Sequence, residues 1–120
     1  MQEQDKTDEF AWPGDLDAMV AAPDHHLPLL ENDRVRVLES VIRPGEATPV
    51  HTHRWSAALY ILGTSHFVRK DSSGNILFDS RSECVIPQVG TALWSAPLEP
   101  HFVENVGDHE IRVISVELKD

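Results

Sequence analysis

Hydrophobic and polar residues alternate along much of the chain with the two-residue period of β-strands. The clearest case is segment 34–42, RVRVLESVI, in which Val35, Val37 and Val41 fall on one face and Arg34, Arg36 and Leu38 on the other. Further short apolar runs are found at 50–53, 57–62, 66–69, 76–78, 84–86, 91–95, 101–106 and 111–118. Turn-forming pairs and clusters separate them, among them Pro44–Gly45 and the stretch 71–75. This rhythm predicts about eight to ten strands in an all-β sandwich or barrel.

The first 25 residues differ from this pattern. Their composition predicts a flexible charged tail at 1–13, followed by a short helix and linker at 14–25, with the barrel domain at 26–120. The helix is expected from Leu16 to Ala22, because Asp15 can cap it and Pro23 ends it. We expect no other helix in the chain.

Length and charge narrow the class of protein. The 120 residues suit one domain, and acidic residues outnumber basic ones 20 to 10. Such an excess of negative charge argues against binding to nucleic acid backbones and to anionic membranes. The single cysteine, Cys84, cannot form an intrachain disulfide, and no apolar run approaches the roughly 20 residues of a membrane span. We therefore expect a soluble cytoplasmic protein.

Seven histidines in a chain with one tyrosine raise the question of metal binding. In His51-Thr52-His53 the two imidazoles share one face of a strand, about 6–7 Å apart at Cα, and can take adjacent positions around one ion. The alternative is a chance pair on a solvent face. A third candidate, His101, follows about 50 residues later. If the strands close a barrel, all three can project into one lumen.

The positions of these histidines and of nearby glycines resemble the two motifs of a known family. Those that resemble the first motif of the cupin superfamily are Gly45, His51, His53 and Gly63. Those that resemble its second motif are Gly90, Pro97, His101 and Asn105. The resemblance covers roughly residues 34–118 and implies a conical β-barrel of two antiparallel sheets, a double-stranded β-helix. It also implies that His51, His53 and His101 are the metal-binding residues.

The sequence departs from the family pattern at one ligand. Cupins have a glutamate ligand shortly after the second histidine, and this chain has Ala57 and Ala58 in that region. The resemblance then leaves three imidazoles, which would leave a divalent ion its full charge and open positions for water or substrate. It implies a divalent transition metal, whether Fe, Zn, Ni, Mn or Cu, and a dioxygenase-like enzyme acting on a small organic molecule. The alternatives are a non-catalytic small-molecule binder and a metal-free relic of the fold.

Other residues are candidates for the lining of the lumen. The expected pocket residues are Trp55, Tyr60, Phe67, Trp94 and Asn105. Ordinary core packing is the alternative for each aromatic residue. Arg54 and Arg69 could bind an anionic group of a substrate, although exposed arginines are common on strands. His25 and His26 are expected to form a partly exposed pair without a ligand role. We expect a homodimer, since small cupins often dimerise.

Overall fold

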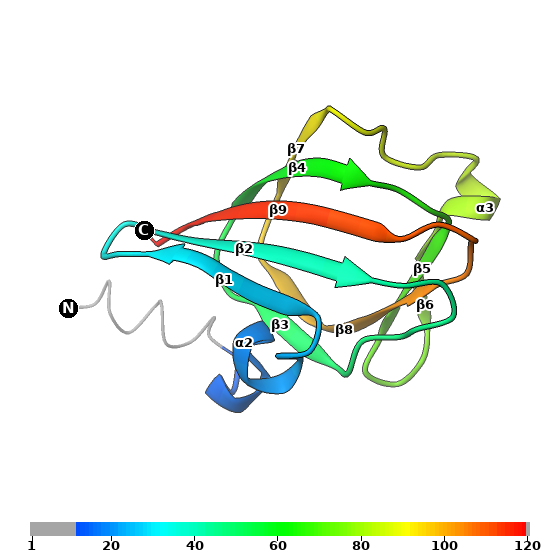
Figure 1. Ribbon diagram of the computed structural model, residues 1–120. Helices are drawn as coiled ribbons and strands as arrows, with labels where there is room; N and C mark the ends of the chain where they lie inside the picture. Colours follow the sequence, from blue (N-terminus) through cyan, green and yellow to red (C-terminus); the bar gives the residue numbers. More distant parts are fainter. Residues whose placement is uncertain (1–11, 120) are drawn as a thin grey trace.

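The computed structural model describes residues 12–119 (Figure 1). The tail expected at 1–13 lies almost entirely outside the described residues. No helix among the described residues is long and apolar enough to cross a membrane.

Two antiparallel sheets make up the protein, which confirms the all-β prediction. The first has five strands in the order β1 (His26–Glu31), β2 (Val35–Ile42), β9 (Ile111–Leu118), β4 (Ala57–Gly63) and β7 (Ala92–Ser95). The second has four strands in the order β3 (His51–His53), β8 (Leu98–Asn105), β5 (Phe67–Asp71) and β6 (Ile76–Asp79). Figure 1 shows the second sheet curving behind the first, so that the inner faces of both sheets enclose a lumen.

The central pairing of the five-stranded sheet joins β2 to β9. It runs without interruption from Val35 opposite Leu118 to Ile42 opposite Ile111. Because side chains alternate along a strand, Leu38 and Ile42 face inward and are buried. Arg36 belongs to the same inward set and is only 5% exposed. A charged residue therefore occupies a core position of a central strand, and it needs buried partners.

The helical segments differ from the prediction. The helix expected over Leu16–Ala22 is split into a 3₁₀ turn, η1 (Gly14–Leu16), and α2 (Ala18–Ala21). The two parts meet at Asp17, whose side chain accepts a hydrogen bond from the Met19 amide and so caps α2 instead of continuing the first turn. Helix α2 packs against β1 and β3.

Three further expectations are wrong. A second short helix, α3 (Ser80–Glu83), begins after Asp79, whose carboxylate accepts a hydrogen bond from the Arg81 amide. The strand expected at 84–86 does not form, because Cys84 ends α3 in the left-handed conformation with φ of 57°. In addition, β8 begins at Leu98, three residues before the strand start expected at His101.

Candidate metal centre

Four imidazoles meet at one end of the lumen. His51 and His53 come from β3, His101 from β8 and His26 from the first position of β1. The strand register brings His51 opposite His101, and their ring centroids are 4.5 Å apart. The centroid of the His26 ring lies 4.9 Å from that of His51 and 5.2 Å from that of His53. The structure thus brings the three expected histidines together and adds a fourth.

The sequence analysis missed His26, which is buried and not part of an exposed pair. Its neighbour His25 is not part of the cluster. The ring contacts join only His26, His51, His53 and His101, while the Nδ1 of His25 donates to the carbonyl of Val41 at 2.9 Å. The sequence signal that could have indicated this role is the position of His26 at the start of a strand. A side chain there belongs to one face of the sheet, and in this protein that face points into the lumen. Without the pairing of β1 with β2, the sequence does not reveal which face that is.

Each of the four rings is held through Nδ1 by an oxygen that can only accept. The bonds run from His26 to the Ala22 carbonyl (2.9 Å), from His51 to the Pro49 carbonyl (2.8 Å), from His101 to the Glu99 carbonyl (2.6 Å) and from His53 to Oε2 of Glu117 (2.9 Å). A carbonyl or carboxylate oxygen requires a proton on Nδ1, so each ring, in its neutral form, carries its proton on that nitrogen. Their Nε2 atoms therefore keep a lone pair.

These Nε2 lone pairs are available to a ligand. Among residues 12–119, none of the four Nε2 atoms forms a hydrogen bond within the protein. One nitrogen each of His26, His51 and His53 lie within 4.8 Å of one another, close enough to hold one ion. His101, which the sequence predicted as a ligand, does not belong to this group at that spacing, although its ring lies next to that of His51. Nitrogen donors without a protein partner, converging from separate strands, are the arrangement of a metal site.

Burial keeps these imidazoles neutral. It lowers the pKa of His51 to about 3 and the pKa of His26 and of His101 to about 4, and neighbouring imidazoles act in the same direction. All three rings are then uncharged at pH 7. A neutral imidazole is the form that binds metal ions, so the folded chain presents its donors in the required state.

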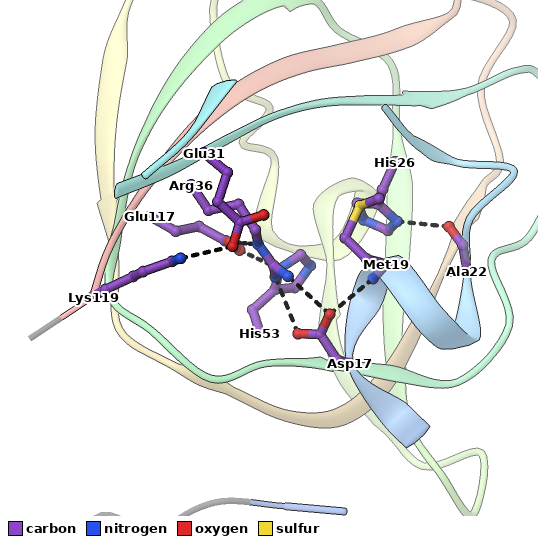
Figure 2. A network of polar contacts seen from close by, with 9 residues as sticks. All are labelled: Asp17, Met19, Ala22, His26, Glu31, Arg36, His53, Glu117 and Lys119. Carbon is purple, nitrogen blue, oxygen red and sulfur yellow. Dashed lines mark hydrogen bonds and ion pairs between the residues drawn. The ribbon is translucent and has the colours of Figure 1, made fainter. Parts of the chain in front are cut away.

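A chain of ion pairs stands behind His53 (Figure 2). Oε1 of Glu117 accepts from Nε of Arg36 at 2.6 Å, while the other end of the same guanidinium donates to both oxygens of Asp17 at 2.9 and 3.0 Å. Burial alone would raise the pKa of Glu117, but the hydrogen bonds from His53 and Arg36 outweigh it and lower that pKa. The carboxylate is therefore ionised, and it fixes the orientation and tautomer of His53.

Glu117 also occupies the place next to the missing glutamate ligand. In the pairing of β4 with β9, Ala57 lies directly opposite Glu117, which is 0% exposed. A carboxylate thus reaches this region from the neighbouring strand, but both of its oxygens are already engaged by Arg36 and His53. The alternation of IRVISVEL puts Glu117 on the face of Val113 and Ser115, and this was the signal that could have placed it inside.

Above the imidazoles the lumen forms a cavity of about 340 Å³. Of the expected pocket residues, Trp55, Phe67 and Trp94 line it. Arg69 lines it as well, whereas Arg54 is exposed and stacks its guanidinium over Trp55, 5.3 Å from the ring centroid. Trp94 is 64% exposed, so it stands at the open mouth of the cavity.

Two expected pocket residues lie elsewhere. Tyr60 points to the outer face of β4 and is 46% exposed, because Leu59 and Ile61 take the inward positions on either side of it. Asn105 is buried but does not line the cavity. Its amide donates to the carbonyls of Ile42 and His109, so it links the end of β2 to the turn between β8 and β9.

Comparisons with solved structures identify the fold. A cupin domain from Bordetella pertussis Tohama I superposes with a TM-score of 0.63 at 21% identity, over 80% of this chain and 95% of that one. An RmlC-like cupin protein with a double-stranded β-helix fold from Methanocaldococcus jannaschii has a TM-score of 0.55 at 13% identity, over 78% and 77% of the two chains. The polyketide cyclase RemF from Streptomyces resistomycificus has a TM-score of 0.55 at 23% identity, over 83% and 68%.

No protein-family model matches the sequence, and no curated protein matches it either. The structural likeness confirms the fold that the two motifs suggested, a small cupin barrel. At these identities it bears on the fold alone.

Proposed function

We propose that this cupin-fold protein binds a divalent transition metal through His26, His51, His53 and His101 and acts on a small organic molecule in the lumen. The observation that carries the proposal is the common tautomer of the four rings. Each Nδ1 is engaged by the protein, and the four Nε2 lone pairs are left for a shared ligand. Imidazole donors favour Fe, Zn, Ni or Cu over Mn.

A bound ion of this kind supplies Lewis acidity, or redox chemistry if it is iron. The chain itself contributes the surroundings. Glu117 orients His53, and mostly apolar side chains line the cavity beside the imidazoles. Since neutral imidazole ligands cancel none of the charge of a bound ion, an anionic group entering the lumen would be attracted to that ion.

A non-catalytic small-molecule binder is the second candidate, and one observation favours it. Glu117 is the single acidic residue lining the cavity within the described part of the chain, and both of its oxygens are bonded. No carboxylate in the lining is therefore free to act as a general base. A reaction that needs such a base would have to use another group.

A homodimer is part of the proposal. Strand β1 is an edge of the five-stranded sheet, and its side chains Leu27, Leu29 and Leu30 are each about half exposed. An apolar edge strand of this kind gains from being covered by a second copy.

Metal content after reconstitution tests the proposal. The purified protein would be incubated anaerobically with Fe(II), Zn(II), Ni(II) or Cu(II), desalted and assayed by elemental analysis. We expect one ion per chain in the wild type and loss of stoichiometric binding in His26→Ala, His51→Ala and His101→Ala, because each variant lacks one of the proposed donors. His109→Ala, an exposed histidine in a turn, is the control and should bind like the wild type.

The β-rich circular dichroism spectrum should persist in all variants, since the sheets do not depend on these side chains alone. Binding that survives in His51→Ala and His101→Ala would place the ion elsewhere and contradict the proposal. Turnover of small carbonyl and thiol compounds under O₂ by the loaded protein would then separate the enzyme from the binder.

A further inference from the structure

Arg69 lies in the wall of the lumen. It sits on β5 opposite Val103 of β8, and it lines the same cavity as the imidazole cluster. Its charge is near enough to the cluster to help lower the pKa of His101. Yet within residues 12–119 no carboxylate lies within 4.0 Å of its guanidinium, and it donates no hydrogen bond.

The other cations of this protein show how unusual this is. Three more arginine or lysine side chains in the described part of the chain are not exposed, and each has a carboxylate partner. They are Arg36 with Asp17 and Glu117, Lys70 with Glu104 at 3.1 Å, and Lys119 with Glu31 at 2.7 Å. The chain has 20 acidic residues, so the lack of a carboxylate beside Arg69 among the described residues does not come from a shortage of acidic side chains. The lumen instead holds a guanidinium whose donors face open space.

We propose that Arg69 binds the carboxylate of a small organic acid whose apolar body lies along the lumen wall. The inference rests on the proposed function in taking the lumen as the ligand site, and it names the class of ligand. A guanidinium offers a fork of donors that matches a carboxylate with two parallel hydrogen bonds. The wall that would receive the body is lined by Leu59, Ile61, Phe67, Val103 and Val113.

Electrostatics favour an anion at this place. Burial lowers the pKa of Arg69, which shows that its charge is held at a cost in solvation. The carboxylates of Asp17 and Glu117 are both paired with Arg36, so within residues 12–119 the positive charge of Arg69 has no counter-ion of its own. A carboxylate bound to Arg69 would offset that charge and restore the lost solvation.

The cavity suits an acid of moderate size. About 340 Å³ lies at the small end of ligand pockets and accepts an aromatic ring with a short acidic side chain. Trp55 and Trp94 both line the cavity, so their fluorescence reports on occupancy.

The test compares phenylacetate with phenylacetamide, which has the same shape and no charge. Metal is first removed with EDTA, and the EDTA by gel filtration, so that binding reports on the protein alone. Titration followed by tryptophan fluorescence and calorimetry should show phenylacetate binding at least about tenfold more tightly than the amide. Arg69→Gln should remove that preference, and Arg69→Lys should keep part of it, because a charge remains without the fork. Arg54→Gln, which changes an exposed arginine beside the same tryptophan, should leave the preference unchanged.

The outcomes separate this inference from the proposed function. A carboxylate preference that depends on Arg69, in a protein that never retains a metal, would support the inference and overturn the metal site. One ion per chain, with equal binding of acid and amide or no binding of either up to about 10 mM, would overturn the inference alone. A preference that survives in Arg69→Gln would also overturn it. The circular dichroism spectrum of Arg69→Gln should match that of the wild type, which shows that the variant has folded.

Discussion

Each of the two sheets has an inward-facing arginine, Arg36 on β2 and Arg69 on β5, and the surroundings of the two residues are opposite in kind. The guanidinium of Arg36 donates its hydrogen bonds to two carboxylates, those of Glu117 and Asp17, and Asp17 is also the N-cap of α2. No carboxylate accepts from Arg69 in the part of the chain that is described. A buried charge that is paired within its own chain stabilises the structure, whereas an unpaired one can bind a ligand. This difference favours a structural role for Arg36 and a ligand-binding role for Arg69.

The largest effect is expected where the region around Arg36 is broken. Arg36→Met would leave the carboxylates of Glu117 and Asp17 without their partner, and Glu117 is fully buried. Breaking one side of a buried ion pair lowers the free energy of unfolding by about 3–5 kcal/mol. Urea denaturation of the metal-free protein measures this loss.

Arg112→Met serves as the matched control, because Arg112 pairs with Glu39 across an outer surface. An exposed pair contributes about 0–1 kcal/mol, so the control should lose little stability. Equal losses in the two variants would mean that the buried network has no special role.

A smaller effect, on metal affinity, is expected from Glu117→Gln. An amide can accept from only one of Arg36 and His53, so it no longer fixes the proton of His53 on Nδ1. Loss of such a supporting carboxylate typically weakens metal binding about 10–100-fold. Competition titration with a chelator measures it, and Glu104→Gln, which alters only the pair with Lys70, is the control. Unchanged affinity would show that His53 is not a ligand or needs no support.

The smallest effect is expected at the other arginine. Arg69→Met removes a partly buried charge that has no partner, so the free energy of unfolding should stay the same or rise by up to about 1 kcal/mol. The same denaturation experiment measures it beside Arg36→Met. A loss of several kcal/mol would show that Arg69 has a structural partner and would remove the contrast between the two regions.

Most of the fold could be predicted from the sequence, because the relevant signals are local. The alternation in segment 34–42 and the turn signals between runs depend only on neighbouring residues, and they predicted strands that the structure contains. The errors in helix and strand boundaries arose where side-chain hydrogen bonds or an unusual backbone conformation end an element. Asp17 and Asp79 both cap short helices, and Cys84 adopts a left-handed conformation that its own side chain does not favour.

The site was harder to predict because its parts depend on register. His51 and His53 are two residues apart, so their shared face was visible. Glu117 and His26 enter the site only through the pairing of β9 with β4 and of β1 with β2, which no local pattern specifies. The same holds for Tyr60: a shift of one residue in a strand decides between lumen and surface.

Helix α2 connects to the imidazole cluster at both of its ends. Asp17 reaches His53 through Arg36 and Glu117, and the carbonyl of Ala22 holds the ring of His26 (Figure 2). Docking of this helix and occupation of the cluster are therefore coupled equilibria, and the coupling is reciprocal. An ion that favours the oriented rings must favour the docked helix by the same free energy. Amide exchange in Ala18–Ala21 would then report on a ligand bound several residues away.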